Sequence, residues 1–213
     1  PHRLTARPPT IGLPTCLASG DADTVVARAR RARTEWTVVS PLSGLMPRGR
    51  ADAAEGNREA ARIVPDTDGL LQWVIIDPNR VETYQQAAEM LSEPHCVGIK
   101  LHPEEHCYPI TEHGDALFAF AAEHRAVVLV HSGDENSLPE DFLPFAERYP
   151  ETKVILAHLG NGGGAAGDPA TQVRAIQACQ TFLRREQQCE ISLQETLEIW
   201  EGRISRKWRS KPA

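Results

Sequence analysis

The chain contains short runs of Val, Ile and Leu that each stop at a polar residue. Two of them are nearly identical, because 127–130 precedes His131 and 154–157 precedes His158, with a glycine two residues after each histidine. Apolar runs of this length without polar alternation are typical of strands buried on both faces, as parallel strands are in α/β proteins. We therefore expect each histidine to lie at the carboxyl end of a buried parallel strand.

Three earlier runs follow the same pattern and extend it into a repeat. They close at Ser40, Asp77 and Lys100, so the five run ends are separated by 37, 23, 31 and 27 residues. This spacing fits a unit of one strand, one helix and two loops. The pattern predicts an α/β fold in which five strands are parallel and adjacent in chain order, with helices outside them.

The alternation of side chains along a strand indicates which residues of the last three runs share a face. The predicted sets are Gly98, Lys100 and His102, then Val127, Leu129 and His131, and then Val154, Leu156 and His158. Because parallel strands end at the same edge of a sheet, we expect His131 and His158 to point the same way. Lys100 and His102 mark a polar site at that edge.

The remaining segments are predicted to surround the sheet as helices and irregular stretches. Helices are expected over 21–34, 57–64, 78–91, 112–124, 137–149 and 170–183, with Asp77 and a capping box at 137–140 favouring two of the starts. Residues 1–20 are expected to be irregular, and 184–213 to form a divergent basic tail in which 188–193 is a sixth strand. Residues 1–213 are predicted to form a single domain.

Composition and charge narrow the class of protein. A formal net charge of −6 over 213 residues argues against a general binder of nucleic acid or anionic membranes. No apolar stretch approaches about 18 residues and the first residues lack an apolar signal region, so a cytoplasmic protein without a membrane partner is expected. The five dispersed cysteines contain no C-x-x-C pair and are interpreted as reduced thiols. The expected partner is a small-molecule substrate.

Three motifs at the run ends occur together in one order: G-I-K-L-H-P at 98–103, V-H-S-G at 130–133 and A-H-L-G at 157–160. On these motifs, residues 21–178 resemble the amidohydrolase-related family of metal-dependent (β/α)8-barrel enzymes. The resemblance implies a TIM-type barrel with its site at the carboxyl-terminal mouth, where side-chain alternation independently places the polar residues. About six of the eight strands are recognisable, so the barrel is expected to be incomplete, without its first and last strands.

The resemblance also implies roles for individual residues. His131 matches the metal-binding histidine that ends strand five of the family. His158 matches the strand-six histidine, which either binds a second metal or polarises the substrate, and is therefore a candidate metal ligand and catalytic residue. Lys100 matches a strand-four position that is a carboxylated, metal-bridging lysine in two-metal members, and His102 beside it is a candidate substrate-binding residue. The implied cofactor is a divalent metal, with zinc the first candidate.

Two parts of the family's ligand pattern, the H-x-H pair and the strand-eight aspartate, have no counterpart in this sequence. The family opens with H-x-H on strand one, whereas the only histidine before position 95 is His2, which would belong to such a pair only if further residues preceded it. The family also uses a strand-eight aspartate that binds metal and accepts a proton from the attacking water. The last aspartate here is Asp168, and Glu190 is the first candidate to replace it. His131 and His158 alone supply two ligands where catalytic zinc sites usually have three.

Some polar residues near the motifs have competing interpretations. His102 and His106 fit H-x-x-E-H, the zinc motif of inverted metallopeptidases, but that motif requires a helix and His102 closes a strand. His106 is therefore expected at the surface. Asp134 and Glu135, just past the fourth run, are equally consistent with substrate contacts and with ordinary loop acids.

The function expected from these observations is metal-dependent hydrolysis of an amide, ester or lactone, in which metal-activated water attacks the carbonyl. Decarboxylation by the same kind of site is the alternative within the family. A truncated, non-catalytic barrel that acts as a binding or assembly protein is the third interpretation, and the absent ligands favour it. The open strand edges of an incomplete barrel also predict association into homo-oligomers.

Overall fold

The computed structural model describes residues 21–160, 173, 176–177 and 180. Its centre is a parallel sheet whose strands lie side by side in chain order. The strands are β1 (Thr37–Val39), β2 (Leu70–Ile75), β3 (Cys96–Leu101), β4 (Val127–Val130) and β5 (Val154–Leu156). The prediction of five parallel, adjacent strands is confirmed.

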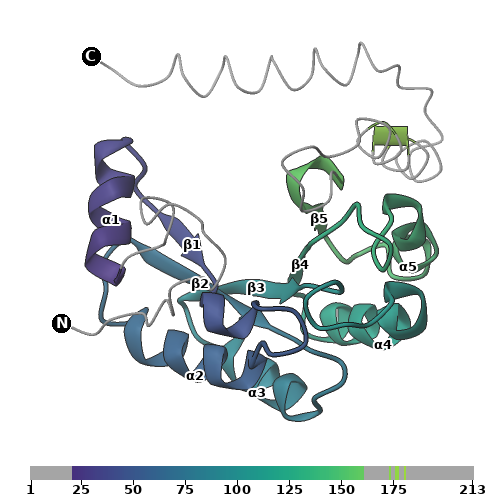
Figure 1. Ribbon diagram of the computed structural model, residues 1–213, viewed down its shortest axis with the longest axis horizontal. Coiled ribbons are helices and arrows are strands. Elements are labelled where there is room, and N and C mark those ends of the chain that lie inside the picture. Colours follow the sequence, from purple (N-terminus) through teal and green to yellow (C-terminus); the bar gives the residue numbers. More distant parts are fainter. Residues whose placement is uncertain (1–20, 161–172, 174–175, 178–179, 181–213) are drawn as a thin grey trace.

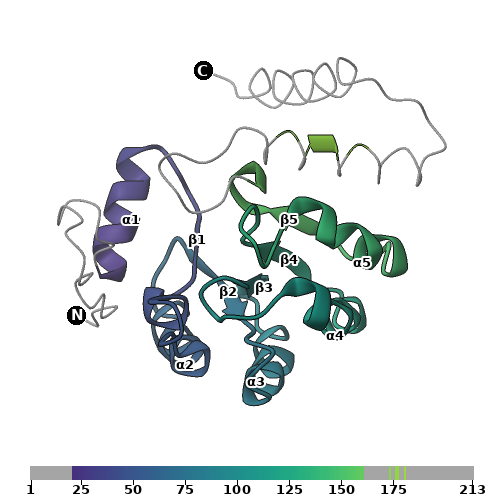
Figure 2. The same ribbon diagram turned by 45° about the vertical axis from the view of Figure 1, so that its right-hand side comes forward.

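The sheet curls into half of a barrel, and helices cover its convex side (Figures 1 and 2). The helices are α1 (Ala22–Arg31), α2 (Ala53–Ile63), α3 (Glu82–Met90), α4 (Ile110–Glu123) and α5 (Leu143–Arg148), with 3-10 turns η2 (Leu42–Gly44), η3 (Pro139–Phe142) and η4 (Ala157–Gly160). The expected fold class, an incomplete TIM-type α/β barrel, is confirmed. The sixth strand expected at 188–193 and most of the helix expected over 170–183 lie outside the described residues.

Helix α3 begins later than the sequence pattern predicted. It starts at Glu82, because the residues after Asp77 form a turn instead of a first helical turn. The Asp77 carboxylate accepts a hydrogen bond from the backbone N–H of Asn79 at 3.0 Å, and the Thr83 hydroxyl donates to the Asp77 carbonyl at 3.0 Å. The Asp77 carboxylate and carbonyl thus find their hydrogen-bond partners within this turn, so Asp77 does not cap α3.

Two other helix starts also differ from the expectation. Helix α2 begins four residues early, at Ala53, because the Asp52 carboxylate caps it by accepting from the Glu55 N–H at 3.0 Å. The capping box predicted at 137–140 is wrong, since the chain passes through η3 before α5 and no side chain caps either element. The Ser137 hydroxyl points to Glu104, 3.5 Å away, instead of to a helix end.

The main hydrophobic core lies between the sheet and the helices that cover it. Its members include Val74, Ile99, Leu101, Val128 and Val130 from the strands, Ile76 just after β2, and Leu117, Phe118 and Ala121 from α4. The expected burial on both faces does not hold at the outer strands, because Val38 of β1 and Ile155 of β5 are 38% and 46% exposed. In a complete barrel this inner face packs against the strands opposite, and the described residues 21–160 do not supply such strands.

Gly98 allows β3 and β4 to approach closely. A Cβ atom at this position would overlap the Val127 carbonyl oxygen and would lie 2.8 Å from Cζ3 of Trp73. The pairing register between β2 and β3 shifts at the same place, between Gln72 and Trp73. The glycine of the G-I-K-L-H-P motif is therefore required by packing, and it keeps the strands that carry His102 and His131 in contact.

Asn57 of α2 pairs with the backbone of β2 beyond the point where β1 ends. The pairing of β1 with β2 stops at Val39 and Gln72. Further along β2, Asn57 donates from Nδ2 to the Ile75 carbonyl at 2.8 Å and accepts from the Ile75 N–H at Oδ1, also at 2.8 Å. The amide thus makes both bonds that a longer neighbouring strand would make, and buried backbone groups need such partners.

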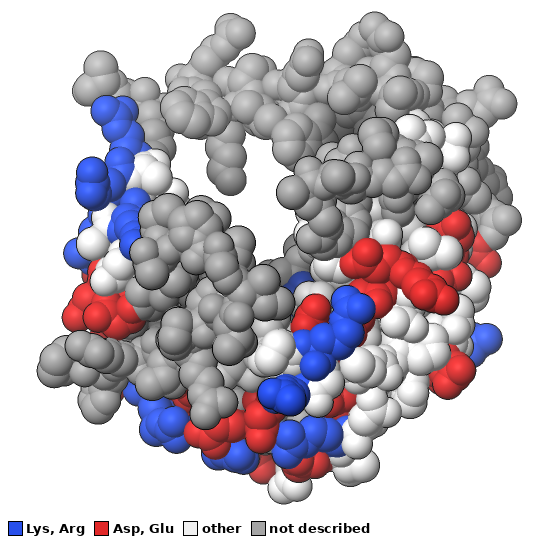
Figure 3. Space-filling model, viewed as in Figure 1, with Lys and Arg blue, Asp and Glu red and all other residues white. Residues whose placement is uncertain are grey.

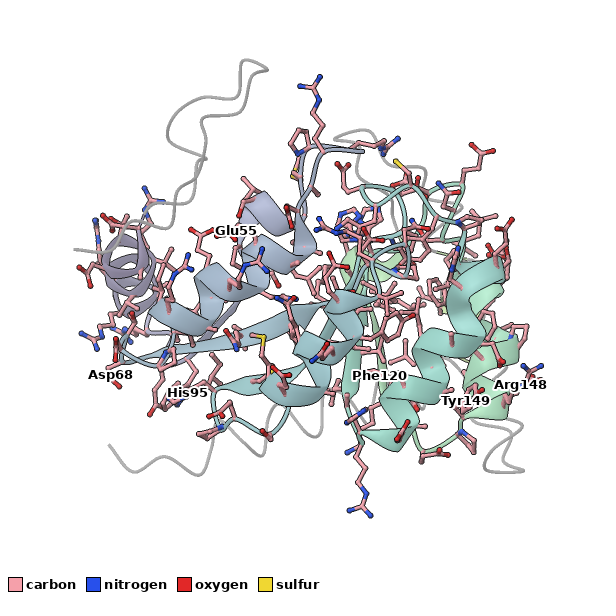
Figure 4. The ribbon with its side chains drawn as sticks, turned by 90° about the horizontal axis from the view of Figure 1, so that it is seen from below. Glu55, Asp68, His95, Phe120, Arg148 and Tyr149 are labelled. Atoms are coloured by element: carbon pink, nitrogen blue, oxygen red, sulfur yellow. The ribbon has the colours of Figure 1, made fainter. Side chains whose placement is uncertain are left out.

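The surface combines ion pairs of both signs. Figure 4 shows Arg148 and Tyr149 beside α4, where both side chains bond the Asp115 carboxylate and so link α4 to α5. Figure 3 shows basic side chains gathered over α1, whose last turn carries Arg28, Arg30 and Arg31. No helix within the described part of the chain is long and apolar enough to cross a membrane.

Candidate active site

The polar residues predicted from the strand ends meet at one edge of the sheet. His102, His131 and His158 follow β3, β4 and β5, whose carboxyl ends all lie at this mouth of the half barrel. The rings of His102 and His131 are stacked, with centroids 4.2 Å apart and planes inclined by 13°. The His131 and His158 rings meet edge to face at 4.7 Å. The structure therefore brings these three imidazoles together at one edge of the sheet.

His131 is hydrogen-bonded at both ring nitrogens. Its Nε2 lies 2.6 Å from Oδ2 of Asp134, and its Nδ1 lies 3.1 Å from Nε2 of His158. A carboxylate can only accept, so Nε2 of His131 carries a proton, and in the neutral ring Nδ1 is then an acceptor. In that neutral form His158 donates its Nε2–H to Nδ1 of His131. The sequence left Asp134 open as either a substrate contact or an ordinary loop acid. In the structure its carboxylate is a hydrogen-bond partner of His131.

His158 reaches the site by a different route from the one predicted. The strand register pairs Ile155 with Leu129 and Leu156 with Val130, so Val154 and Leu156 face the helices and only Ile155 faces the barrel interior. The predicted shared face of Val154, Leu156 and His158 is wrong. The strand ends at Leu156, and the 3-10 turn η4, with His158 at a φ of 40°, brings the ring back toward His131.

Lys100 lies on the interior face of β3, where the register aligns it with Leu129. Only 8% of its surface is exposed, and this burial lowers the pKa of its amine to about 8. At pH 7 roughly a tenth of the molecules then carry an uncharged Lys100 amine, because the ratio of uncharged to charged amine falls tenfold for each pH unit below the pKa. A larger share of this amine is therefore uncharged at neutral pH than in a surface lysine.

Two histidines of the site, His102 and His158, are shifted toward their neutral form. Burial first, and then the charges of His131 and Lys100, lower the pKa of His102 to about 3. Burial, followed by the same two charges, also lowers the pKa of His158. Neutral imidazoles keep a lone pair for a proton or a metal ion, so the environment favours both kinds of chemistry.

The donors fit a metal ion only in part. Two nitrogens on one tetrahedral zinc lie roughly 3.3 Å apart, which is close to the 3.1 Å between Nδ1 of His131 and Nε2 of His158. The His131–Asp134 bond is the outer-shell partner that metal-bound histidines usually have. His102 cannot join them, since an ion cannot lie in the planes of two stacked, nearly parallel rings. Among the described residues no group of three His, Cys, Asp or Glu side chains could hold a metal.

Two buried polar residues close to the site were missed by the sequence analysis. His106 was expected at the surface, but it is 6% exposed and its Nε2 lies 2.9 Å from the Gly44 carbonyl, which ties the β3–α4 loop to η2. Glu104, also buried, accepts from the backbone and side chain of Asn136. Residues 102–106 form a turn and not a helix, which confirms that they are not the H-x-x-E-H zinc motif. The burial of Glu104 could not be predicted from the sequence, because an acidic residue in a loop follows no hydrophobic pattern that would indicate burial.

Comparison with known proteins agrees with this geometry. A family model described as an amidohydrolase matches residues 21–184, which is more than half of the chain. A search of curated proteins finds no match. The matched segment includes the five strands, the three site histidines and Lys100.

Proposed function

The chain belongs to the amidohydrolase family, and from that premise we propose that it is a metal-dependent hydrolase of amide, ester or lactone bonds. This proposal rests mainly on two contacts of His131. Its Nδ1 lies 3.1 Å from Nε2 of His158, and its Nε2 lies 2.6 Å from the Asp134 carboxylate. A carboxylate–histidine pair of this kind is the usual support of a catalytic metal. The proposed substrate is a small molecule that enters at the mouth of the half barrel.

Each residue of the site has a part in this proposal. When bound, zinc would supply Lewis-acid polarisation of a carbonyl and would lower the pKa of a water molecule. His131 would hold the ion through Nδ1, while Asp134 keeps the proton on Nε2 and fixes the ring. His158 would be the second ligand or the group that polarises the substrate. Lys100 would act as a bridging ligand or as a cation facing the developing negative charge, and the neutral ring of His102 would contact the substrate.

A second candidate function is a non-catalytic barrel that binds or assembles with a partner. It is favoured by one observation, that the described residues supply two metal donors and no group of three. With two protein ligands, zinc would be held weakly. The two candidates differ in metal content and turnover, and both can be measured.

The test is to supply the purified chain with zinc and assay it on amide, ester and lactone substrates. We expect weak zinc binding and slow hydrolysis of at least one substrate class, since two ligands suffice to place an ion but not to retain it. His158→Ala should reduce both quantities. Absence of zinc binding and of turnover would favour the non-catalytic candidate, and carbon dioxide release from an unsaturated acid without hydrolysis would redirect the proposal to a decarboxylase.

We also propose that copies of the chain associate through the outer strands of the half barrel. Trp36, just before β1, is 52% exposed, and Ile155, on the inner face of β5, is 46% exposed, so both outer strands of the described sheet present apolar surface. Small-angle scattering and light scattering should then give a mass above that of one chain. Ile155→Lys should lower that mass, whereas Val81→Lys, a change at an exposed turn residue, should not. A monodisperse monomer would contradict the proposal.

A further inference from the structure

Glu104 is a buried carboxylate that joins the two loops bearing the site residues. It lies two residues after His102 and is 5% exposed. Its two oxygens accept from the backbone N–H of Asn136 at 2.7 Å and from Nδ2 of Asn136 at 2.9 Å, with the Ser137 hydroxyl at 3.5 Å. A buried carboxylate is costly unless it is hydrogen-bonded. The β4–α5 loop must therefore keep the conformation that supplies these donors.

That conformation is a tight turn over residues 133–137. The Gly133 N–H donates to the Ser137 carbonyl at 2.8 Å, and the Ser137 N–H donates back to the Asp134 carbonyl at 3.0 Å. The Asn136 carbonyl accepts from the Ile110 N–H at 2.9 Å, which fastens the turn to the start of α4. Glu104 captures the remaining backbone donor of Asn136, so the turn is held from both sides.

Asp134 depends on this turn for its contact with His131. Its side chain is 36% exposed, so packing alone does not hold it, and water competes for its oxygens. The contact with Nε2 of His131 nevertheless measures 2.6 Å. We propose that Glu104 is a positioning residue that, through the turn at 133–137, holds Asp134 against His131 and thereby sets the tautomer and orientation of that ring. The inference deepens the proposed function, on which it rests, because His131 is the proposed metal ligand.

The experiment compares three variants of the full chain with the wild type. Glu104→Ala removes both acceptors, and Glu104→Gln retains one acceptor oxygen for the Asn136 N–H. Glu105→Ala is the matched control, because this neighbour of Glu104 has the same charge but faces Arg48, 3.6 Å away. The first readout is the ¹⁵N NMR shift of the His131 ring nitrogens in the metal-free chain, which distinguishes the tautomers. The second is the zinc dissociation constant.

Glu104→Ala should convert His131 from a single Nε2–H tautomer into a mixture and raise the zinc dissociation constant about 10–100-fold, as loss of an outer-shell partner does. Asp134→Ala should give the same spectrum, Glu104→Gln should restore most of the wild-type signal, and Glu105→Ala should change neither readout. A folded Glu104→Ala chain with a wild-type His131 spectrum would overturn the inference.

If Glu104→Ala does not fold, Asn136→Ala tests the same connection, since it deletes only the Nδ2 bond. A partial shift of the His131 tautomer is expected, and an unchanged spectrum would overturn the inference. The NMR readout needs neither metal nor turnover. If the chain does not hydrolyse any substrate, the NMR result still tests the positioning role of Glu104. If the chain hydrolyses a substrate but the His131 spectrum does not change in the Glu104 variants, only the positioning role is refuted.

Discussion

Replacing His131 by alanine is expected to abolish zinc binding and to reduce any hydrolysis to background. His131 is the ring on which the site converges, because it contacts His102, His158 and Asp134. Loss of an outer-shell partner alone typically costs 10–100-fold in metal affinity or activity, so loss of the ligand itself should cost at least about 100-fold. Zinc titration and initial rates on the substrate identified for the wild type measure the two effects.

His95→Ala is the matched control for this prediction. His95 precedes β3 and so lies at the opposite end of the sheet from the three site histidines (Figure 4). Its backbone carbonyl accepts from the Gln72 N–H at 2.8 Å, a bond that alanine preserves. Zinc affinity and rate should stay at the wild-type level. If His131→Ala retains about one equivalent of zinc or the wild-type rate, the site does not act through His131, and Glu190 becomes the first carboxylate to test.

Replacing Asn57 by alanine is expected to destabilise the whole half barrel. The change would leave both the N–H and the C=O of Ile75 without their present partners in a region where Asn57 is 1% exposed. A buried polar group left unpaired costs about 1–3 kcal/mol, so the two together should cost about 2–6 kcal/mol. This is a large part of the roughly 5–15 kcal/mol that stabilises a typical domain. Urea unfolding followed by circular dichroism measures the loss.

Arg58→Ala, at the next position of α2, provides the comparison. Arg58 is exposed and pairs with Glu55 at 2.8 Å on the helix surface, and such pairs contribute about 0–1 kcal/mol. Its unfolding midpoint should lie close to that of the wild type. Equal midpoints for Asn57→Ala and Arg58→Ala would show that water replaces the asparagine amide at Ile75, and that this bond pair does not hold β2 to α2.

The loops over the mouth are also connected to one another, which bears on how the site is held. His106 bonds the Gly44 carbonyl of η2, and Nδ2 of Asn79 donates to the His106 carbonyl at 3.2 Å. The Gly49 N–H donates to the Glu105 carbonyl at 2.9 Å. The loops after β1, β2 and β3 are thus joined by two side-chain-to-backbone bonds and one backbone bond. Connections of this kind pre-organise the residues of a site.

The local pattern of residues was sufficient for the strands, their order and part of the site. Apolar runs without alternation mark buried parallel strands, and their regular spacing leaves one simple way to connect them. Side-chain alternation then correctly placed Lys100, His102 and His131, because each lies within its strand or one residue beyond it. The motifs of the family gave the same residues and the family itself, which the match over 21–184 confirms.

Only the tertiary structure decided how the other groups act. His158 reaches the site against the alternation of β5, because the strand stops early and a 3-10 turn redirects the ring. Glu104 and Asn57 find their partners 32 and 18 residues away, at distances along the chain where no periodicity connects the positions. A repeating pattern records which faces of a strand or helix are buried. It does not record which polar groups meet once those faces are packed, since that depends on where each strand ends and how each loop folds over the mouth.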